Sequence, residues 1–316
     1  MGKEGESVYT YIQEIWKEIV KILLVVDIPN WALDRTADMI IKHLPYDIEK
    51  IYADQFKQSM TKKYNYVHFM NWLDGKEYDG VSGGVCSHNW ELKHLGQAKK
   101  KMPKMRALTA ISRRLCLKLK RYNSVYYCPN GVDLEMFSPG FNDHEFTVGW
   151  VGQKTTGGFG ETKSSEGVKG YDIKGYELIL KPLIKRMENR VKFKVLDNAY
   201  SDALSFSLMP GWYGDIDVLI CTSLYEGCPF PVLEAAASGK AIVSTNVGVV
   251  DEITDFLIKS PSSRKEVPAA IDEFEKKILY LAENRDICQR EGEKSRKHVQ
   301  KFSWAEVVHN WKEFFK

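Results

Sequence analysis

The fold is indicated most directly by the stretch YEGCPFPVLEAAASG at residues 225–239. It follows an apolar run, 217–221, that is typical of a buried strand. Pro231 suits the first turn of a helix, where its missing N–H costs nothing, and Gly239 suits the position just past a helix end. We therefore predict a loop at the carboxyl end of a strand, followed by a helix over 231–238 whose first N–H groups form an anion site.

Two carboxylates belong to this stretch. Glu226 precedes the turn, and Glu234 is expected in the first turn of the helix. A carboxylate beside a phosphate site is understandable if it accepts hydrogen bonds from sugar hydroxyls, as acidic residues do toward ribose in dinucleotide-binding folds. The alternative is that both glutamates simply place negative charge at a helix N-terminus, where it is favourable.

Short apolar runs alternate with helical patterns along the whole chain, in two series that meet near residues 138–145. The runs lie at 21–27, 65–71, 80–88, 105–112 and 124–128 in the first series, and at 146–152, 191–196, 216–221 and 241–245 in the second. Alternation of this kind predicts parallel sheets built from strand–helix–strand units. Such sheets bind their ligands at the carboxyl ends of the strands.

The predicted fold class is therefore α/β, with two Rossmann-like parallel-sheet domains facing across a cleft. The hinge between them is expected in the stretch SPGFNDHE at 138–145, because proline, glycine and polar residues favour a loop there. The expected parts are an N-terminal helical extension (1–20), a first Rossmann-like domain (21–140), a second (141–302) and a C-terminal helix (303–316) that packs back on the first domain.

Composition excludes several classes of protein. Of the 316 residues, 44% are hydrophobic and 28% are charged, which fits a soluble globular chain. A net charge of +3 is too small for a nucleic-acid-binding face, so no nucleic-acid partner is expected. The six cysteines form no C-x-x-C pair and no zinc spacing, which favours a reducing, cytoplasmic location and no metal site. No apolar run approaches the ~18 residues of a spanning helix.

The basic residues gather in two runs of the N-terminal half. The first holds Lys99, Lys100, Lys101, Lys104 and Arg106, and the second holds Arg113, Arg114, Lys118, Lys120 and Arg121. One interpretation is a solvated helix face. The other is a surface that meets anionic lipid, giving a peripheral membrane contact, or an anionic acceptor.

The stretch EGCPFPVLEAAASGKAIVSTNVGVVDEI at 226–253 resembles the signature E-G-x-P-x-x-x-L-E-A-x-A-x-G-x-P-V-V-x-T-x-x-G-G-x-x-E. That signature is typical of retaining GT-B glycosyltransferases of the family 4 type, also called glycosyl transferases group 1. Ala241 stands where proline is usual, and Val249 stands where the second glycine is usual. Further matches are the connector PNGVD at 129–133 and a K-G element at Lys174. The resemblance covers most of residues 21–260.

The resemblance implies a role for each matching residue. Glu226 would contact the transferred sugar, and Glu234 would hold the ribose hydroxyls of the nucleotide. Lys174 would neutralise the departing diphosphate, and His88 would lie at the sugar, which makes Glu226, Lys174 and His88 the catalytic candidates. Backbone N–H groups would meet the sugar or the phosphates along the segment Gly227, Cys228, Pro229, Phe230, Pro231 and Val232.

Departures from the family pattern concern the phosphate contacts. Gln153 stands where a basic residue is usual after Gly152, so Lys154 is expected to supply the second positive charge. Lys169 is a rival of Lys174 for the K-G role, and Lys174 is preferred because a helical pattern follows it. The first loop of the N-terminal domain lacks glycine, and Asn30 is expected to place the next helix near a phosphate.

The activity implied is that of a metal-independent, retaining hexosyltransferase in polysaccharide biosynthesis. It would move a sugar from a UDP-, GDP- or ADP-linked donor to a glycan, lipid-linked or other hydroxyl acceptor, without a cofactor. The first domain would bind the acceptor and the second the donor. The glycine run at 157–160 lacks the G-K-[ST] ending of a P-loop. The alternatives are another GT-B enzyme, such as a sugar-nucleotide epimerase, and a non-catalytic glycan-binding protein.

His68 is expected to be structural.

Overall fold

The computed structural model describes residues 20–86, 94–140, 145–154, 172–197 and 204–316. The chain divides into two compact units, one made of Met1–Asn130 with Trp304–Lys316 and the other of Gly131–Ser303. The predicted N-terminal extension, apart from Val20, lies outside the described residues, and so does the glycine run at 157–160.

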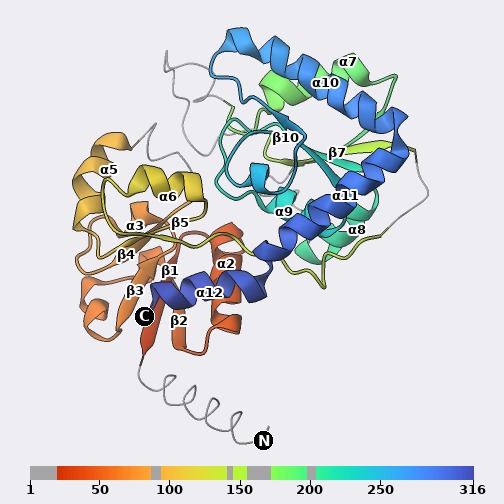
Figure 1. Ribbon diagram of the computed structural model, residues 1–316. Helices are drawn as coiled ribbons and strands as arrows, with labels where there is room; N and C mark the ends of the chain where they lie inside the picture. The colour runs from red at the N-terminus through yellow and green to blue at the C-terminus, as the bar shows by residue number, and fades with distance from the viewer. Residues whose placement is uncertain (1–19, 87–93, 141–144, 155–171, 198–203) are drawn as a thin grey trace, which may run out of the picture. The chain divides into compact units, whose positions relative to one another are not determined.

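Within the described residues, the first unit holds a six-stranded parallel sheet in the order β2-β1-β3-β4-β5-β6 (Figure 1). Its strands are β1 Lys21–Val26, β2 Asp47–Tyr52, β3 Tyr66–Phe69, β4 Ser82–Val85, β5 Leu108–Ala110 and β6 Val125–Tyr127. Its helices are α2 Ala32–His43, α3 Trp72–Gly75, α5 Leu95–Lys101, α6 Arg113–Leu119 and α12 Trp304–Phe314. The edge strand β2 has the sequence DIEKIY. It was not predicted, because three of its six residues are charged and none is fully buried.

The inner strand β1 organises this unit by burying both of its faces. Leu23 and Val25 point into a core shared with β3, β5 and α6. Ile22, Leu24 and Val26 point into a second core with α2 and α12. Alternate residues of a strand face opposite sides, so one apolar run serves both cores.

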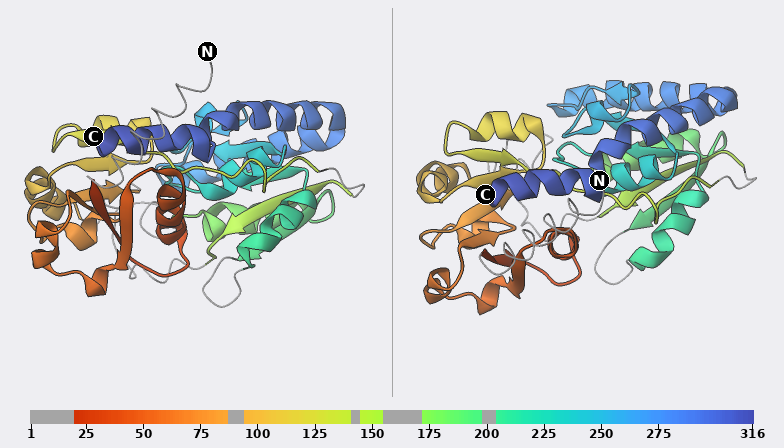
Figure 2. Two further views of the ribbon diagram at one scale, coloured as in Figure 1. Left: turned by 90° about the horizontal axis from the view of Figure 1, so that it is seen from below. Right: turned by 60° about the horizontal axis from the view of Figure 1, so that its bottom comes forward.

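The last helix of the chain completes the first unit. α12 packs against α2 and β6, and Figures 1 and 2 show it as the dark blue helix ending at the C-terminus. It contributes Trp304, Val307, Trp311 and Phe314 to the second core. The first unit is therefore closed by residues from both ends of the described chain.

In the second unit, the described residues form a five-stranded parallel sheet in the order β11-β10-β9-β7-β8. Its strands are β7 Thr147–Gly152, β8 Lys192–Asp197, β9 Val218–Cys221, β10 Ala241–Thr245 and β11 Leu257–Ile258. Its helices are α7 Lys181–Met187, α8 Met209–Gly214, α9 Phe230–Ala237, α10 Val267–Glu283 and α11 Arg285–Val299. Two units with parallel α/β sheets confirm the predicted fold class.

Helix α11 was not predicted from the sequence, because it packs through small residues. Its buried positions are Cys288, Gly292, Ser295 and Val299, which give little apolar periodicity. A Cβ on Gly292 would lie 2.1 Å from the carbonyl oxygen of Gly239, so glycine is what permits α11 to lie this close to the end of α9.

The boundary between the units differs from the predicted one. The sequence placed it after residue 140, whereas the structure places it after Asn130. The connector that follows is held by the second unit, because Val132 N–H donates to the carbonyl of Phe302 at 2.8 Å. The Arg296 guanidinium also donates to the carbonyls of Leu134 at 3.0 Å and Phe137 at 2.7 Å. Proline and glycine composition alone could not reveal these contacts.

His68 of β3 is structural, as predicted. Its ring is fully buried, with Nδ1 3.0 Å from Ser82 Oγ and Nε2 3.3 Å from Thr109 Oγ1. Ser82 donates its own proton to the carbonyl of Val67, so its oxygen accepts from His68 Nδ1–H. Burial lowers the pKa of His68 from 6.5 to about 3.

This burial makes the first unit sensitive to acid. Between pH 6.5 and about 3 the unfolded chain protonates His68 while the folded chain keeps it neutral. The free energy of unfolding should therefore fall on acidification, by up to ~1.4 kcal/mol per pH unit from this group alone. Urea titrations from pH 7 to pH 4 should show a shallower decline for His68→Gln. The exposed His309→Gln is the matched control, and an equal decline in wild type and His68→Gln would contradict the prediction.

Candidate functional site

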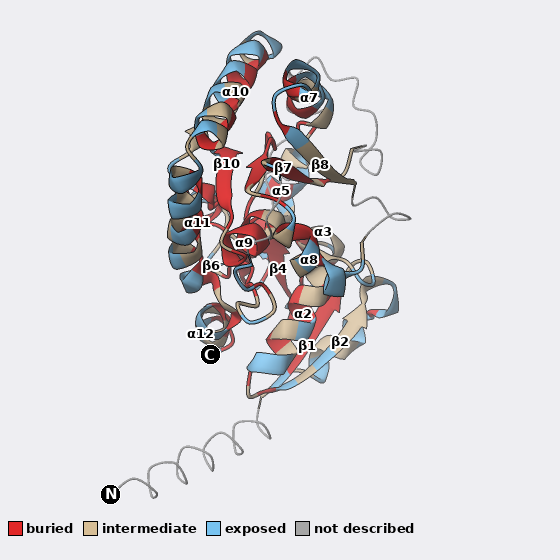
Figure 3. Ribbon diagram, turned by 90° about the vertical axis from the view of Figure 1, so that its right-hand side faces the viewer, coloured by how far each residue is buried: buried red, intermediate tan, exposed pale blue. Residues whose placement is uncertain are grey.

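The candidate segment lies between the carboxyl end of β9 and helix α9. α9 begins at Phe230, one residue earlier than predicted, and carries Pro231 in its first turn. Gly239 ends the helix at a φ of 71°, and its N–H donates to the carbonyl of Ala236 at 3.0 Å. The predicted bracket of Pro231 and Gly239 is thus confirmed. Figure 3 shows α9 and the neighbouring β10 as buried elements, so the segment is anchored in the core.

The backbone donors predicted along 227–232 are fewer than expected. Val232 N–H donates to the carbonyl of Pro229 at 3.1 Å, which commits it to the start of the helix. Two prolines in the segment have no N–H at all. The predicted backbone contacts are therefore reduced to Gly227, Cys228 and Phe230, and for these three they stay predictions.

Glu234 is not in the first turn of α9, and that prediction was wrong. The helix begins at Phe230 and its first turn holds no acidic residue, so Glu234 lies in the second turn. Its side chain is buried, and Tyr213 of α8 donates its hydroxyl proton to Oε2 at 2.8 Å. Loading of the helix N-terminus therefore does not account for Glu234. The sequence analysis left Tyr213 outside the site because tertiary folding alone brings it to Glu234.

Lys174 and Glu226, 52 positions apart in the chain, meet at the end of β9. Lys174 Nζ lies 2.5 Å from Glu226 Oε1, and Ser223 donates its hydroxyl proton to the same oxygen at 3.0 Å. The Lys174 side chain is 33% exposed and that of Glu226 is 14% exposed. Two of the three predicted catalytic residues are therefore in direct contact and still reachable from solvent.

The electrostatics of this pair keep the lysine charged. Burial lowers the pKa of the Lys174 ammonium, but the charge of Glu226 and its hydrogen bond outweigh burial and raise that pKa above its ordinary value. Lys174 is therefore a cation at neutral pH, balanced by one carboxylate.

The loop that carries Lys174 is held against Thr222, the residue just past the end of β9. Gly175 has a φ of 69°, and a Cβ on it would lie 2.1 Å from the carbonyl oxygen of Thr222. Thr222 Oγ1 donates to the carbonyl of Lys174 at 2.7 Å and accepts from Trp150 Nε1 at 3.0 Å. These contacts give Lys174 and Gly175 a physical reason to be the K-G element. The rival pair at 169–170 lies outside the described residues.

The chain continues from Gly175 into a π-helical turn, Tyr176–Leu180. The buried Asp172 carboxylate caps this turn by accepting from the N–H groups of Tyr176 at 3.0 Å and Leu178 at 2.9 Å. This cap fixes the orientation in which the lysine loop leaves the sheet.

Lys154 lies at the same carboxyl edge of the sheet, just past Gly152 and the end of β7. Its N–H donates to Asp197 Oδ1 at 3.2 Å, and its ammonium lies 5.7 Å from the centroid of the Tyr176 ring. Lys154 thus reaches the π-helical turn that follows Lys174. Its expected part in binding a diphosphate stays a prediction.

The loop after β10 supports the glutamate loop. Gly248 has a φ of 55°, and a Cβ on it would lie 2.1 Å from the carbonyl oxygen of Gly227 and 3.0 Å from that of Glu226. Val249 has an ordinary φ of −96°, so the second glycine of the family pattern is not needed there.

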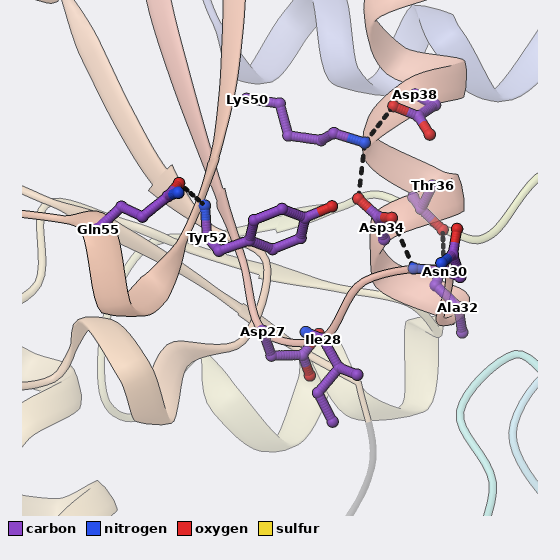
Figure 4. Close-up of polar contacts among 10 residues, drawn as sticks. All are labelled: Asp27, Ile28, Asn30, Ala32, Asp34, Thr36, Asp38, Lys50, Tyr52 and Gln55. Carbon is purple, nitrogen blue, oxygen red and sulfur yellow. Dashed lines mark hydrogen bonds and ion pairs between the residues drawn. The ribbon is translucent and has the colours of Figure 1, made fainter. Parts of the chain in front are cut away.

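The site residues predicted in the first unit have a different setting. His88 lies outside the described residues. Asn30 adopts a left-handed φ of 62°, and its N–H donates to Asp34 Oδ2 at 2.8 Å. Lys50 donates to the other oxygen of Asp34 at 2.6 Å and also binds Asp38 (Figure 4). Carboxylates at the start of α2 work against a phosphate there, and the role of Asn30 stays a prediction.

The two basic runs fall mainly on α5 and α6. Some of their charges are used within the unit, since Lys101 pairs with Glu77 at 2.5 Å and the Arg113 guanidinium lies 4.6 Å from the centroid of the Tyr127 ring. Contact of this surface with lipid stays a prediction. No helix among the described residues is long and apolar enough to cross a membrane. In the same part of the chain, no group of three or more His, Cys, Asp or Glu residues is placed to hold a metal ion.

Comparison with known proteins finds a similarity to glycosyltransferases over part of the chain. Residues 180–284 match the family model described as glycosyl transferases group 1. The matched region contains Tyr213, Glu226 and Glu234 but not Lys174. A similar curated protein is the MMP alpha-(1->4)-mannosyltransferase of Mycolicibacterium hassiacum, 31% identical over 109 residues. Those residues are 34% of this chain and only 26% of the relative.

Solved structures resemble the chain over nearly its full length. Sucrose-phosphate synthase from Thermosynechococcus elongatus matches with a TM-score of 0.66 at 12% identity, over 94% of this chain and 98% of that one. HepE from Anabaena, solved in complex with UDP, matches with a TM-score of 0.64 at 14% identity, over 93% and 99% of the two chains. Both sheets therefore match those of GT-B glycosyltransferase structures.

The contact at Gly175 can be tested by adding one methyl group. Gly175→Ala places a Cβ against the Thr222 carbonyl and forces alanine into a left-handed φ, so it should lower the free energy of unfolding by at least ~2 kcal/mol. Gly211→Ala is the control, because this exposed helical glycine has nothing within 4 Å of an added Cβ. It should be neutral or raise stability by up to ~1 kcal/mol. Equal urea midpoints for the two variants would refute the role of Gly175.

Proposed function

We propose that this chain is a glycosyltransferase that moves a hexosyl group from a nucleotide sugar to a hydroxyl group of a glycan, lipid-linked or other acceptor, with retention of configuration at the anomeric carbon. The observation that carries the proposal is the contact between Lys174 and Glu226 at the end of β9. A cation for a diphosphate and a carboxylate for sugar hydroxyls stand together where α/β sheets bind their ligands.

In the proposed reaction, the two members of this ion pair have separate roles. The bond between the anomeric carbon and the diphosphate breaks, and negative charge grows on the departing nucleoside diphosphate. Lys174 stabilises that charge, which is transition-state electrostatics. The acceptor oxygen forms its bond to the anomeric carbon on the same face, and its proton passes to an oxygen of the departing phosphate. Glu226 accepts hydrogen bonds from hydroxyls of the transferred sugar, and Glu234 accepts them from the ribose.

Donor binding therefore has to separate an ion pair that already exists. Before the donor arrives, Lys174 and Glu226 neutralise each other at 2.5 Å. A diphosphate competes for the ammonium, and the hydroxyls of the sugar compensate the carboxylate. Nucleotide and sugar thus replace the partner of each residue together, which favours the intact donor over either half.

The proposal includes neither a metal ion nor a cofactor. The cationic Lys174, with Lys154 at the same sheet edge, and the N–H groups of Gly227, Cys228 and Phe230 are the groups proposed to balance the diphosphate. UDP is the first nucleotide to test, since HepE from Anabaena was solved with UDP and with UDP and glucose. GDP and ADP are the other members of the panel.

Removing either member of the pair should stop transfer while changing nucleotide affinity in opposite directions. Lys174→Met loses the compensating cation, so transfer should fall at least ~100-fold and nucleoside diphosphate should bind more weakly. Glu226→Gln should lose transfer to a similar extent but bind the diphosphate more tightly, because Lys174 no longer has a competing carboxylate. Initial rates and calorimetric Kd values measure both effects.

The matched control for these substitutions is the exposed pair of Lys181 and Glu177, whose charged atoms are 3.0 Å apart. Lys181→Met and Glu177→Gln change the same groups at exposed positions of the helical segment that follows Lys174, and should keep transfer and binding near wild type. Normal turnover in Lys174→Met or Glu226→Gln would disprove the assignment.

Nucleotide binding should not require metal. In buffer with EDTA, a saturating amount of the correct nucleoside diphosphate should raise the melting temperature, because a ligand that binds only the folded state stabilises it by about 2.7 kcal/mol at 100 times its Kd. A thermal-shift panel of UDP, GDP and ADP with their sugar conjugates would identify the donor. If no nucleotide shifts the melting temperature, with or without Mg²⁺, the non-catalytic alternative is favoured. A shift that appears only with Mg²⁺ would overturn metal independence.

A further inference from the structure

The hydroxyl of Tyr213 is a polar group placed deep in the second unit. Its side chain is fully buried, and the hydroxyl donates to Glu234 Oε2 at 2.8 Å. The two residues come from different helices, α8 and α9. A buried carboxylate is costly unless hydrogen bonds satisfy it, so this contact first of all stabilises Glu234 in its place.

The orientation of the Tyr213 ring is set by the core. Its edge packs against Phe137 and Trp212, with ring centroids 5.9 Å and 5.2 Å away and interplanar angles of 72° and 89°. The carbonyl of Phe137 is in turn held by the Arg296 guanidinium at 2.7 Å. The position of the phenol oxygen is therefore determined by packed aromatic rings before any ligand binds.

A carboxylate can accept more hydrogen bonds than one phenol donates. An ionised carboxylate offers about four lone-pair sites on two oxygens. A hydroxyl that donates to Oε2 restrains the rotation of the carboxylate about its terminal C–C bond, and therefore the directions of its other lone pairs. A pair of vicinal hydroxyls on a ribose needs acceptors in fixed directions, and a carboxylate oriented in advance binds them without a further entropic cost.

We propose that Tyr213 is a positioning residue for nucleotide recognition, which holds Glu234 in the orientation that accepts the ribose hydroxyls. This inference rests on the proposed function. Tyr213 touches no substrate and acts only through Glu234. Loss of its hydroxyl should therefore weaken the binding of nucleotides that have ribose hydroxyls. A purely structural hydrogen bond would affect nucleotides with and without these hydroxyls alike.

Tyr213→Phe tests the inference by removing a single oxygen atom. Calorimetric Kd values are measured for UDP and for 2′,3′-dideoxy-UDP, with the GDP or ADP pair in their place if wild type binds one of those instead. Tyr213→Phe should weaken UDP roughly tenfold, and change the dideoxy nucleotide less than about twofold. The same variant should raise the KM of the donor with little change in kcat.

The matched control is Tyr64→Phe. Tyr64 also donates to a glutamate, with its hydroxyl 2.6 Å from Glu49 Oε2, but it lies in the first unit. Tyr64→Phe should leave both Kd values unchanged. Equal weakening of UDP and the dideoxy nucleotide by Tyr213→Phe would overturn the proposal in favour of a structural role, and so would an unchanged Kd for UDP.

A second comparison covers the case in which Tyr213→Phe does not fold. Glu234→Ala removes the buried carboxylate that the hydroxyl satisfies, and the double variant Glu234→Ala with Tyr213→Phe should then bind UDP as Glu234→Ala does. A further loss in the double variant would show that Tyr213 does not act through Glu234, and would overturn the proposal. If wild type binds no nucleotide, the proposed function itself is wrong. The titration of wild type shows this without any variant, so the two failures are distinguishable.

Discussion

The candidate site depends on the close approach of three loops that leave no room for a Cβ atom. The loops after β7, β9 and β10 converge at one sheet edge, where Gly175 lies against the Thr222 carbonyl and Gly248 against the Gly227 carbonyl. A Cβ on either glycine would lie 2.1 Å from the facing oxygen. Both glycines also have positive φ, a conformation that costs other residues energy. This double constraint is what brings Lys174 to Glu226.

Charge balance then determines what the converged loops can do. Lys174 and Glu226 neutralise each other, and Ser223 adds a hydrogen bond to the shared carboxylate oxygen. The pair is satisfied but partly exposed, so a ligand with an anionic and a hydroxylated end can replace both partners. Glu234 is the opposite case, because it is buried and oriented by Tyr213. The site thus combines an exchangeable pair with a carboxylate that is oriented in advance.

The two sheets show which elements an apolar sequence pattern predicts and which ones only tertiary contacts reveal. The runs at β1, β7 and β10 predicted their strands well, because both faces of an inner parallel strand are buried and the sequence is continuously apolar. The edge strand β2 and the helix α11 were missed, because one is charged and the other buries mostly small residues. The domain boundary moved from 140 to 130, because Arg296 and Phe302 hold the connector on the second unit.

By itself, the sequence determined the class of fold and the helix between Pro231 and Gly239. Both follow from local chemistry, since proline, glycine and apolar periodicity act over a few neighbouring residues. Lys174, Glu226 and Glu234 were predicted as site residues through the family resemblance, and their roles stay predictions. Only the tertiary structure decided that Lys174 pairs with Glu226, that Glu234 lies in the second turn of α9, and that Tyr213 holds it. Those contacts join residues 21 to 52 positions apart, and their geometry depends on how strands and helices pack rather than on local propensity.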